Sequence, residues 1–179
     1  MVDFVSIIKM YYKEGGDAFE LLLKHSRQVA DKASAIIEAK PGLCVDRDFV
    51  QEAAMLHDIG VFLTDAPDIY CHGNEPYIKH GILGRALLDE LGLPRHALVC
   101  ERHTGAGISV VDIKAQGLPL PLRDMLPLTI EEKLVCYADK FYSKSHPDKE
   151  FTFEQARKKL EKYGVATVAR FDALHELFA

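Results

Sequence analysis

Apolar side chains recur with the period of an α-helix along most of this chain. The clearest run follows Asp17, continues through Phe19, Leu22 and Val29, and stops before Pro41. Side chains three and four residues apart share one helix face, so this run predicts a long helix over about residues 18–39 with a buried stripe. Asp17 stands three residues before Glu20, the spacing of a capping box, and this marks the start of the helix.

The same period predicts further helices at about 47–60, 76–92, 94–103, 130–142, 152–164 and 165–178, with a short one near 4–12. No alternating stretch is long enough to predict a sheet, although residues 108–111 could form an isolated extended piece. The connections over 60–75 and 104–128 are longer than simple turns, and loops of this length in a compact domain are usually functional. The prediction is an all-α bundle of about six to eight helices.

Composition limits what such a bundle can do. The chain has 179 residues, with 22 Lys plus Arg against 27 Asp plus Glu, a formal net charge of −5. This length predicts a single domain over residues 1–179, with its core over about 17–145 and further helices over about 150–179. The negative charge and the lack of a basic run disfavour binding to duplex nucleic acid. No stretch is long and apolar enough for a membrane span, and the first residues lack a basic n-region, so a cytoplasmic location is expected.

Eight histidines are present, and five of them fall at positions where a chain can build a metal site. His57 and Asp58 are adjacent at the end of a buried helix, where they are either a capping pair or two metal ligands. His25 and Asp139 both fall on the inward face of their helices, where a lone histidine is more often a core residue but a lone carboxylate is costly. One metal held by His25, His57, Asp58 and Asp139 would satisfy all four side chains.

His80 and His103 extend this pattern. His80 shares a helix face with Leu83 and Leu87, and Gly81 and Gly84 beside it would allow another helix to approach closely. His103 ends the next predicted helix. Inward ligands on several helices make a two-metal site a reasonable hypothesis, because a carboxylate can bridge two ions about 4 Å apart.

His25, the run Leu56-His57-Asp58-Ile59-Gly60, His80, His103 and the run Tyr137-Ala138-Asp139-Lys140 together resemble the HD-domain superfamily of metal-dependent phosphohydrolases, in its small HDIG-type branch. The resemblance covers roughly residues 17–145. It implies that His25, His57, Asp58 and Asp139 hold a first metal, and that Asp58 bridges to a second ion on His80 and His103. It implies one or two divalent ions, with Fe or Mn favoured and Ni, Zn and Mg left open.

Two departures from the family pattern affect the substrate. Many members follow HDIG with a lysine that meets the substrate phosphate, whereas Val61 stands here. Phosphate charge must then be met elsewhere, and the candidates are Arg27, Arg102, Lys140 and the backbone of Thr104 and Gly105. The Gly-Tyr-Pro element of the cyclic-dinucleotide phosphodiesterase branch is also absent, so that substrate is set aside.

The leading hypothesis is a phosphohydrolase that cleaves a phosphate ester or anhydride of a nucleotide or dinucleotide. Water activated by the metal would attack phosphorus, with Asp58, Arg102 and Lys140 as catalytic residues and Arg27, Thr104, Gly105 and Lys140 binding the substrate. The main alternative is a non-catalytic HD module that binds a metal and a nucleotide for regulation. A third is a helical interaction domain without metal. The basic run Arg157-Lys158-Lys159 is interpreted as the solvated side of a packing helix, and a homodimer is left open.

Overall fold

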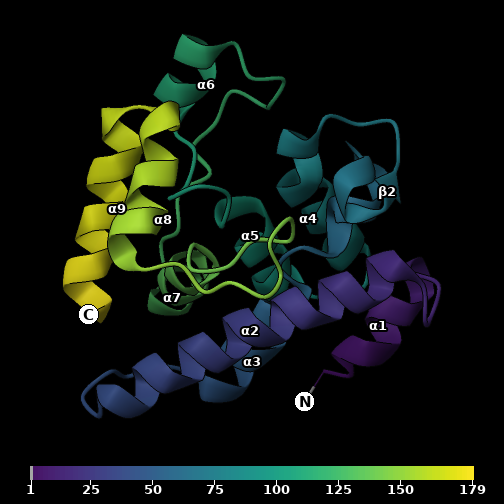
Figure 1. Cartoon of the computed structure of the whole chain (residues 1–179), viewed down its shortest axis with the longest axis horizontal. Coiled ribbons are helices and arrows are strands. Elements are labelled where there is room, and N and C mark those ends of the chain that lie inside the picture. The colour runs from purple at the N-terminus through teal and green to yellow at the C-terminus, as the bar shows by residue number, and fades with distance from the viewer. Residues whose placement is uncertain (1) are drawn as a thin grey trace.

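The computed structural model describes residues 2–179, and these residues are mostly helical (Figure 1). The α-helices are α1 (Phe4–Tyr11), α2 (Asp17–Ala39), α3 (Arg47–Leu56), α4 (His80–Glu90), α5 (Pro94–Arg102), α6 (Val110–Gln116), α7 (Ile130–Asp139), α8 (Phe153–Leu160) and α9 (Val165–Phe178). Short 3-10 helices cover η1 (Ile59–Leu63), η2 (Pro67–Ile69), η3 (Tyr77–Lys79) and η4 (Glu161–Tyr163). The predicted all-α class is confirmed.

The long helix α2 runs along one side of the molecule, and α3 and α7 pack against it (Figure 1). Its inward stripe holds Val29 and Ala33, which are fully buried, as the apolar period predicted. Leu134 and Val135 on α7 and Phe171 on α9 belong to the same apolar core. The last helix is therefore packed against the bundle through Phe171, which also lies against Tyr137 of α7.

The segment around His57 and the connection that follows it differ from their predictions. The helix expected to reach Gly60 ends at Leu56, and the tighter helix η1 follows His57 and Asp58. The connection over 60–75 contains a small antiparallel sheet of β1 (Asp65–Ala66) and β2 (Cys71–His72). Each strand has only two residues, which is too short for an alternating pattern to predict it. Among residues 2–179 no helix is long and apolar enough to cross a membrane.

The second long connection also differs from its prediction. Ile108 pairs with Met125 as expected for extended backbone, but Val110 and Val111 begin helix α6 instead. Ser109 caps that helix, since its side chain accepts from the backbone N–H of Asp112 and Asp112 bonds back to Ser109. A local capping box thus outweighs the β-propensity of the two valines.

Glycines bring the histidine-bearing segments together. A Cβ at Gly60 would lie 2.3 Å from the backbone N of Gly84 and 2.4 Å from the carbonyl O of His80, so only glycine allows η1 to touch α4. A Cβ at Gly81 would lie 2.6 Å from the carbonyl O of Cys100, which places α4 equally close to α5. The predicted role of Gly81 in close helix packing is confirmed.

Candidate metal centre

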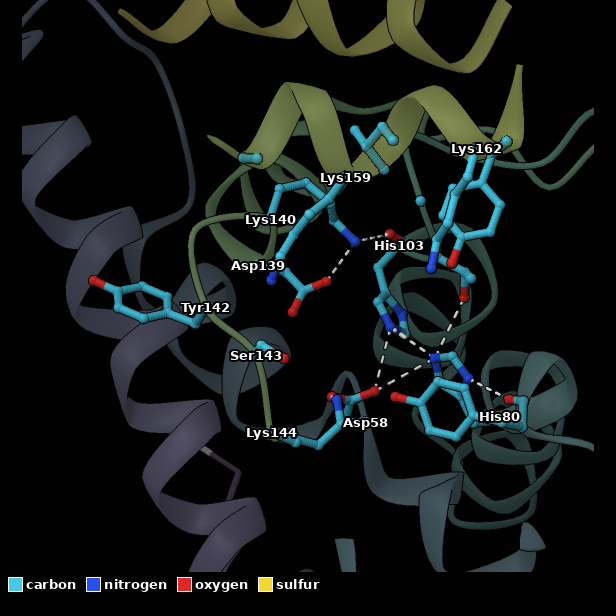
Figure 2. A pocket seen from close by; sticks show the side chains of 16 residues that line it. Asp58, His80, His103, Asp139, Lys140, Tyr142, Ser143, Lys144, Lys159 and Lys162 are labelled. Atoms are coloured by element: carbon cyan, nitrogen blue, oxygen red, sulfur yellow. Dashed lines mark hydrogen bonds and ion pairs between the residues drawn. The ribbon is translucent and has the colours of Figure 1, made fainter. Parts of the chain in front are cut away.

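Six buried side chains from five segments come together, and four of them, Asp58, His80, His103 and Asp139, line one cavity. They form two groups that share Asp58: His25, His57, Asp58 and Asp139, and Asp58, His80 and His103. Within each group the nearest ligand atoms all lie within 4.8 Å of one another. Figure 2 shows Asp58 between His103, His80 and Asp139, with lysines around them. The structure therefore brings together all six residues that the sequence nominated as metal ligands.

The first group is a compact set of two imidazoles and two carboxylates. His25 Nε2 lies 3.2 Å from Asp58 Oδ2 and 3.0 Å from Asp139 Oδ1. His57 Nε2 lies 3.1 Å from Asp58 Oδ2 and 3.5 Å from Asp139 Oδ1. Two ligand atoms about 2.1 Å from one ion are about 3.0 to 3.4 Å apart at octahedral or tetrahedral angles, so these spacings suit a single divalent cation.

The second group uses the other oxygen of Asp58. Asp58 Oδ1 lies 3.5 Å from His80 Nε2 and 3.3 Å from His103 Nε2, and the two Nε2 atoms are 3.1 Å apart. The carboxylate thus turns Oδ2 to one group and Oδ1 to the other. This is the arrangement that a carboxylate bridging two ions requires.

Backbone carbonyls determine which ring nitrogen carries the proton. The Nδ1 atoms of His57, His80 and His103 lie 2.7, 2.7 and 2.8 Å from the carbonyl O atoms of Ala54, Tyr77 and Cys100. A carbonyl only accepts, so each Nδ1 carries a hydrogen, and a neutral ring presents a lone pair at Nε2. The Nε2 lone pairs of His80 and His103 then face each other across 3.1 Å. A cation between these two lone pairs would remove their repulsion. Histidines that bind a metal are commonly oriented by a hydrogen bond from the other ring nitrogen, as these are by the backbone carbonyls.

Orphaned polar atoms lead to the same conclusion. His25 Nε2, His57 Nε2 and Asp58 Oδ1 are buried and have no hydrogen-bond partner. Burying a polar group without a partner costs free energy, and the cost is larger for a charged one. One cation in each ligand group would satisfy these atoms, the first at the two Nε2 atoms and the second at Asp58 Oδ1. Imidazole and carboxylate ligands suit Mn, Fe, Zn or Ni, so the residues fit a divalent transition metal.

The acidic side chains stay ionised despite their burial. Burial alone would raise the pKa of Asp58, but Lys144 and His57 hold that pKa well below the usual value. Burial would also raise the pKa of Asp139, but the charge of Lys140 holds that pKa well below the usual value. Both carboxylates are therefore available as ligands at neutral pH.

The histidines divide into charged and neutral members. Burial opposes the charged form of His57, yet Asp58 and Asp139 raise its pKa to about 9. For His80, burial outweighs the attraction of Asp58 and lowers the pKa to about 3. In the metal-free protein at neutral pH, His57 is thus an imidazolium, whereas His80 is already in the form that binds a metal.

This difference predicts that metal binding releases a proton. A metal ligand must be neutral imidazole, so His57 has to lose its proton when a divalent ion binds below pH 9. Titration of the chelator-treated protein with Mn²⁺ at pH 7.5, in two buffers of different ionisation enthalpy, should show about one proton released per protein. The apparent metal affinity should increase as the pH rises from 6 towards 9. A heat independent of the buffer would show that His57 is neutral beforehand.

Lys144 is the residue at this centre that sequence reasoning missed. Its Nζ forms an ion pair with Asp58 Oδ2, and its side chain is only 10% exposed. Burial would lower the pKa of Lys144, but Asp58 raises it above the usual value, so it carries a positive charge. Lys144 lies in the loop after α7, where neither helical period nor a motif could indicate its direction.

Other predicted substrate residues separate into two sets. Thr104, Gly105 and Lys140 line the cavity, and Lys140 Nζ lies 2.5 Å from Asp139 Oδ2 and 3.1 Å from the carbonyl O of His103. Arg27 and Arg102 do not line it. The structure therefore corrects the prediction that Arg27 binds the substrate and that Arg102 is catalytic. Arg27 is on the exposed side of α2, and Arg102 Nη1 binds both carboxylate oxygens of Glu132 at 2.9 Å.

The cavity that four of the six ligands line has a volume of about 290 Å³. Its walls come from α7 and the following loop on one side and from α8 and η4 on the other. Lys159, Lys162 and Tyr163 line it, and the first two extend towards it in Figure 2. Lys159 is exposed, as predicted for the solvated side of α8, and the structure adds that it also lines this cavity.

Comparisons with known proteins agree with this geometry. The family model described as HD domain matches residues 22–143 of the chain. An uncharacterized protein of Methanocaldococcus jannaschii is 39% identical over 123 residues, which are 67% of this chain and 65% of that protein. The crystal structure of the HD domain of the L. monocytogenes phosphodiesterase PgpH superimposes with a TM-score of 0.56 at 15% identity and covers 99% of this chain and 97% of that one. At this identity the superposition shows a shared fold.

Two other relatives are named as tRNA methyltransferases. A tRNA (cytidine(56)-2'-O)-methyltransferase of Picrophilus torridus is 34% identical over 162 residues, which are 89% of this chain and 42% of that protein. The protein of the same name from Thermoplasma volcanium is 29% identical over 96% of this chain and 45% of its own length. The chain thus spans less than half of either methyltransferase.

Proposed function

The chain belongs to the HD-domain family, and from this premise we propose that it is a metal-dependent phosphohydrolase that cleaves a phosphate ester or anhydride of a nucleotide. The observation that carries the proposal is the buried carboxylate of Asp58, whose two oxygens serve two separate groups of ligands. A structural metal needs one closed set of ligands, whereas two sets beside an open cavity favour catalysis.

Each part of the site has a chemical task in this proposal. His25, His57, Asp58 and Asp139 would hold one divalent cation, and His80 and His103 would share a second with Asp58. When bound, such cations lower the pKa of a coordinated water and neutralise charge on phosphoryl oxygens. Asp58 would orient both groups through its two oxygens.

Lysines would supply the remaining positive charge. We assign the substrate phosphate to Lys144 and Lys140, which both line the cavity from the segment that begins at the end of α7. Lys144 neutralises Asp58 in the metal-free protein, and its Nζ would be released towards the cavity once cations neutralise that carboxylate. A lysine from this loop would thereby supply the charge that Val61 cannot.

Methyl transfer is not part of the proposal. The two relatives named as tRNA methyltransferases are matched over only 42% and 45% of their length, and the shared part contains an HD-type ligand set here. A phosphodiester in RNA is nevertheless a reasonable member of a substrate panel.

The decisive experiment combines metal analysis with such a panel. Protein purified with and without oxygen would be assayed against nucleoside mono-, di- and triphosphates, dinucleoside polyphosphates and short RNA, with Mn²⁺ or Fe²⁺. We expect turnover that a chelator abolishes and added metal restores. We also expect saturating metal to raise the melting temperature by about 5 to 10 °C, because a ligand at 100 times its Kd stabilises by about 2.7 kcal/mol.

Other outcomes would support the alternatives. Metal bound with a rise in melting temperature, but no turnover of any substrate, would indicate the regulatory HD module. Less than about 0.1 equivalent of metal and no thermal shift with Mn, Fe, Ni or Zn would indicate a helical interaction domain.

A further inference from the structure

A second cavity adjoins the one above the metal centre. It has a volume of about 330 Å³, and Tyr77, Thr104, Gly105 and Tyr163 line both cavities. Each cavity by itself is near the lower end of the roughly 300 to 1,000 Å³ typical of ligand pockets. Because they share walls, one elongated ligand could occupy both.

The second cavity has a different chemical character from the first. Apolar side chains of Ile78, Ile108 and Leu118 line it, whereas its neighbour contains the metal ligands and lysines. A few polar groups also line the wall: Asp112, Gln116 and Thr167. The carboxylate of Asp112 is paired with Arg170. A mainly apolar pocket with a few hydrogen-bonding groups is typical of a site for a small organic group.

Two tyrosines stand where the cavities join. Tyr77 and Tyr163 both line the cavity, and each side chain is 40% exposed, which is high for a large aromatic residue. Exposed aromatic faces of this kind stack on planar rings and contribute about 1 to 3 kcal/mol per nucleobase where they do so. A planar ring is therefore the organic group that best fits this position.

Lysines lie on the other side of the tyrosines. Lys159 and Lys162 line the metal-centre cavity, and their Nζ atoms face the rings of Phe151 at 3.2 Å and Tyr163 at 4.8 Å rather than carboxylates. Lys140 and Lys144 approach the same cavity from the opposite wall. This positive charge is suited to a ligand with more than one phosphate.

We propose that the second cavity, over Ile78, Ile108, Gln116 and Leu118, is a nucleoside subsite, and that Tyr77 and Tyr163 hold the base while Lys159 and Lys162 bind the phosphates over the metal centre. This inference rests on the proposed function and adds the orientation of its substrate. An aliphatic phosphate would offer no planar ring to the two tyrosines, and inorganic phosphates would leave the second cavity unused.

Ligands with and without a nucleoside on the same diphosphonate group test this assignment. Calorimetry on the Mn²⁺-loaded protein would compare methylenediphosphonate with the α,β-methylene analogues of purine and pyrimidine nucleoside diphosphates. We expect at least one nucleoside analogue to bind 10-fold or more tightly than methylenediphosphonate. Leu118→Trp, which fills the second cavity, should remove that preference, whereas Leu122→Trp, at a side chain that is 67% exposed, should preserve it.

The lysine half of the site is tested separately. Lys162→Ala should weaken the binding of the nucleoside analogue and of methylenediphosphonate by a similar factor, because both carry the same two phosphorus groups.

Equal binding of all ligands to the wild-type protein would overturn the inference, as would a preference that survives in a folded Leu118→Trp variant. A preference without turnover in the substrate panel would refute hydrolysis and keep the subsite. Turnover without a preference would refute the subsite alone.

Discussion

Replacing Asp58 with alanine is expected to remove both metal binding and hydrolysis while the helices remain. Asp58 is 1% exposed and is the only one of the six ligands that belongs to both groups. Its loss leaves His25 and His57 with a single carboxylate and leaves His80 and His103 with none. Metal ions contribute several kcal/mol to stabilising charge in the transition state, so turnover should fall by about 10³-fold or more. Metal analysis, initial rates and circular dichroism measure the three effects.

Control variants separate loss of the site from loss of the fold. Asp148→Ala removes a carboxylate that is 89% exposed on the loop after α7, and it should leave metal content and turnover unchanged. If Asp58→Ala fails to fold because buried Lys144 loses its partner, Asp58→Asn preserves the volume and removes only the charge. A folded Asp58 variant that retains metal and turnover would contradict the assignment of the centre.

Substitution of Lys144 by methionine is expected to have opposite effects on metal and on substrate. Without the ammonium group on Asp58 Oδ2, a divalent cation meets less competition, so metal affinity should increase. The substrate phosphate loses a charge-assisted hydrogen bond, which is worth about 1.5 to 3 kcal/mol, so KM should rise by about 10- to 100-fold. Metal titration and steady-state kinetics on the same preparation measure both.

The matched control is Lys149→Met, an exposed lysine in the same loop whose Nζ lies 5.3 Å from the ring of Phe151. Neither metal affinity nor KM should change there. If Lys144→Met weakens metal binding and leaves KM unchanged, Lys144 maintains the structure of the loop instead of binding phosphate. The two readouts therefore distinguish a phosphate ligand from a structural ion pair.

The sequence by itself determined the helical class, because apolar residues at helical spacing must face a common core. The terminal helix agrees at both ends with its prediction, Val165 to Phe178, since Gly164 and the end of the apolar run mark it. The sequence also determined the six candidate ligands. Inward polar side chains such as Asp139 are costly unless they share a partner, and that requirement can be recognised without coordinates.

Only the tertiary structure decided which cations serve the site. Arg102 and Lys144 have similar charge and both stand near a candidate ligand in sequence, yet Glu132 engages Arg102 while a loop turns Lys144 onto Asp58. A long cationic side chain pairs with a carboxylate that lies within its reach. Which carboxylate lies there depends on contacts between residues far apart in sequence. The same reason applies to Lys159: its place on the wall of the cavity depends on where α8 lies in the fold, which periodicity along one helix does not encode.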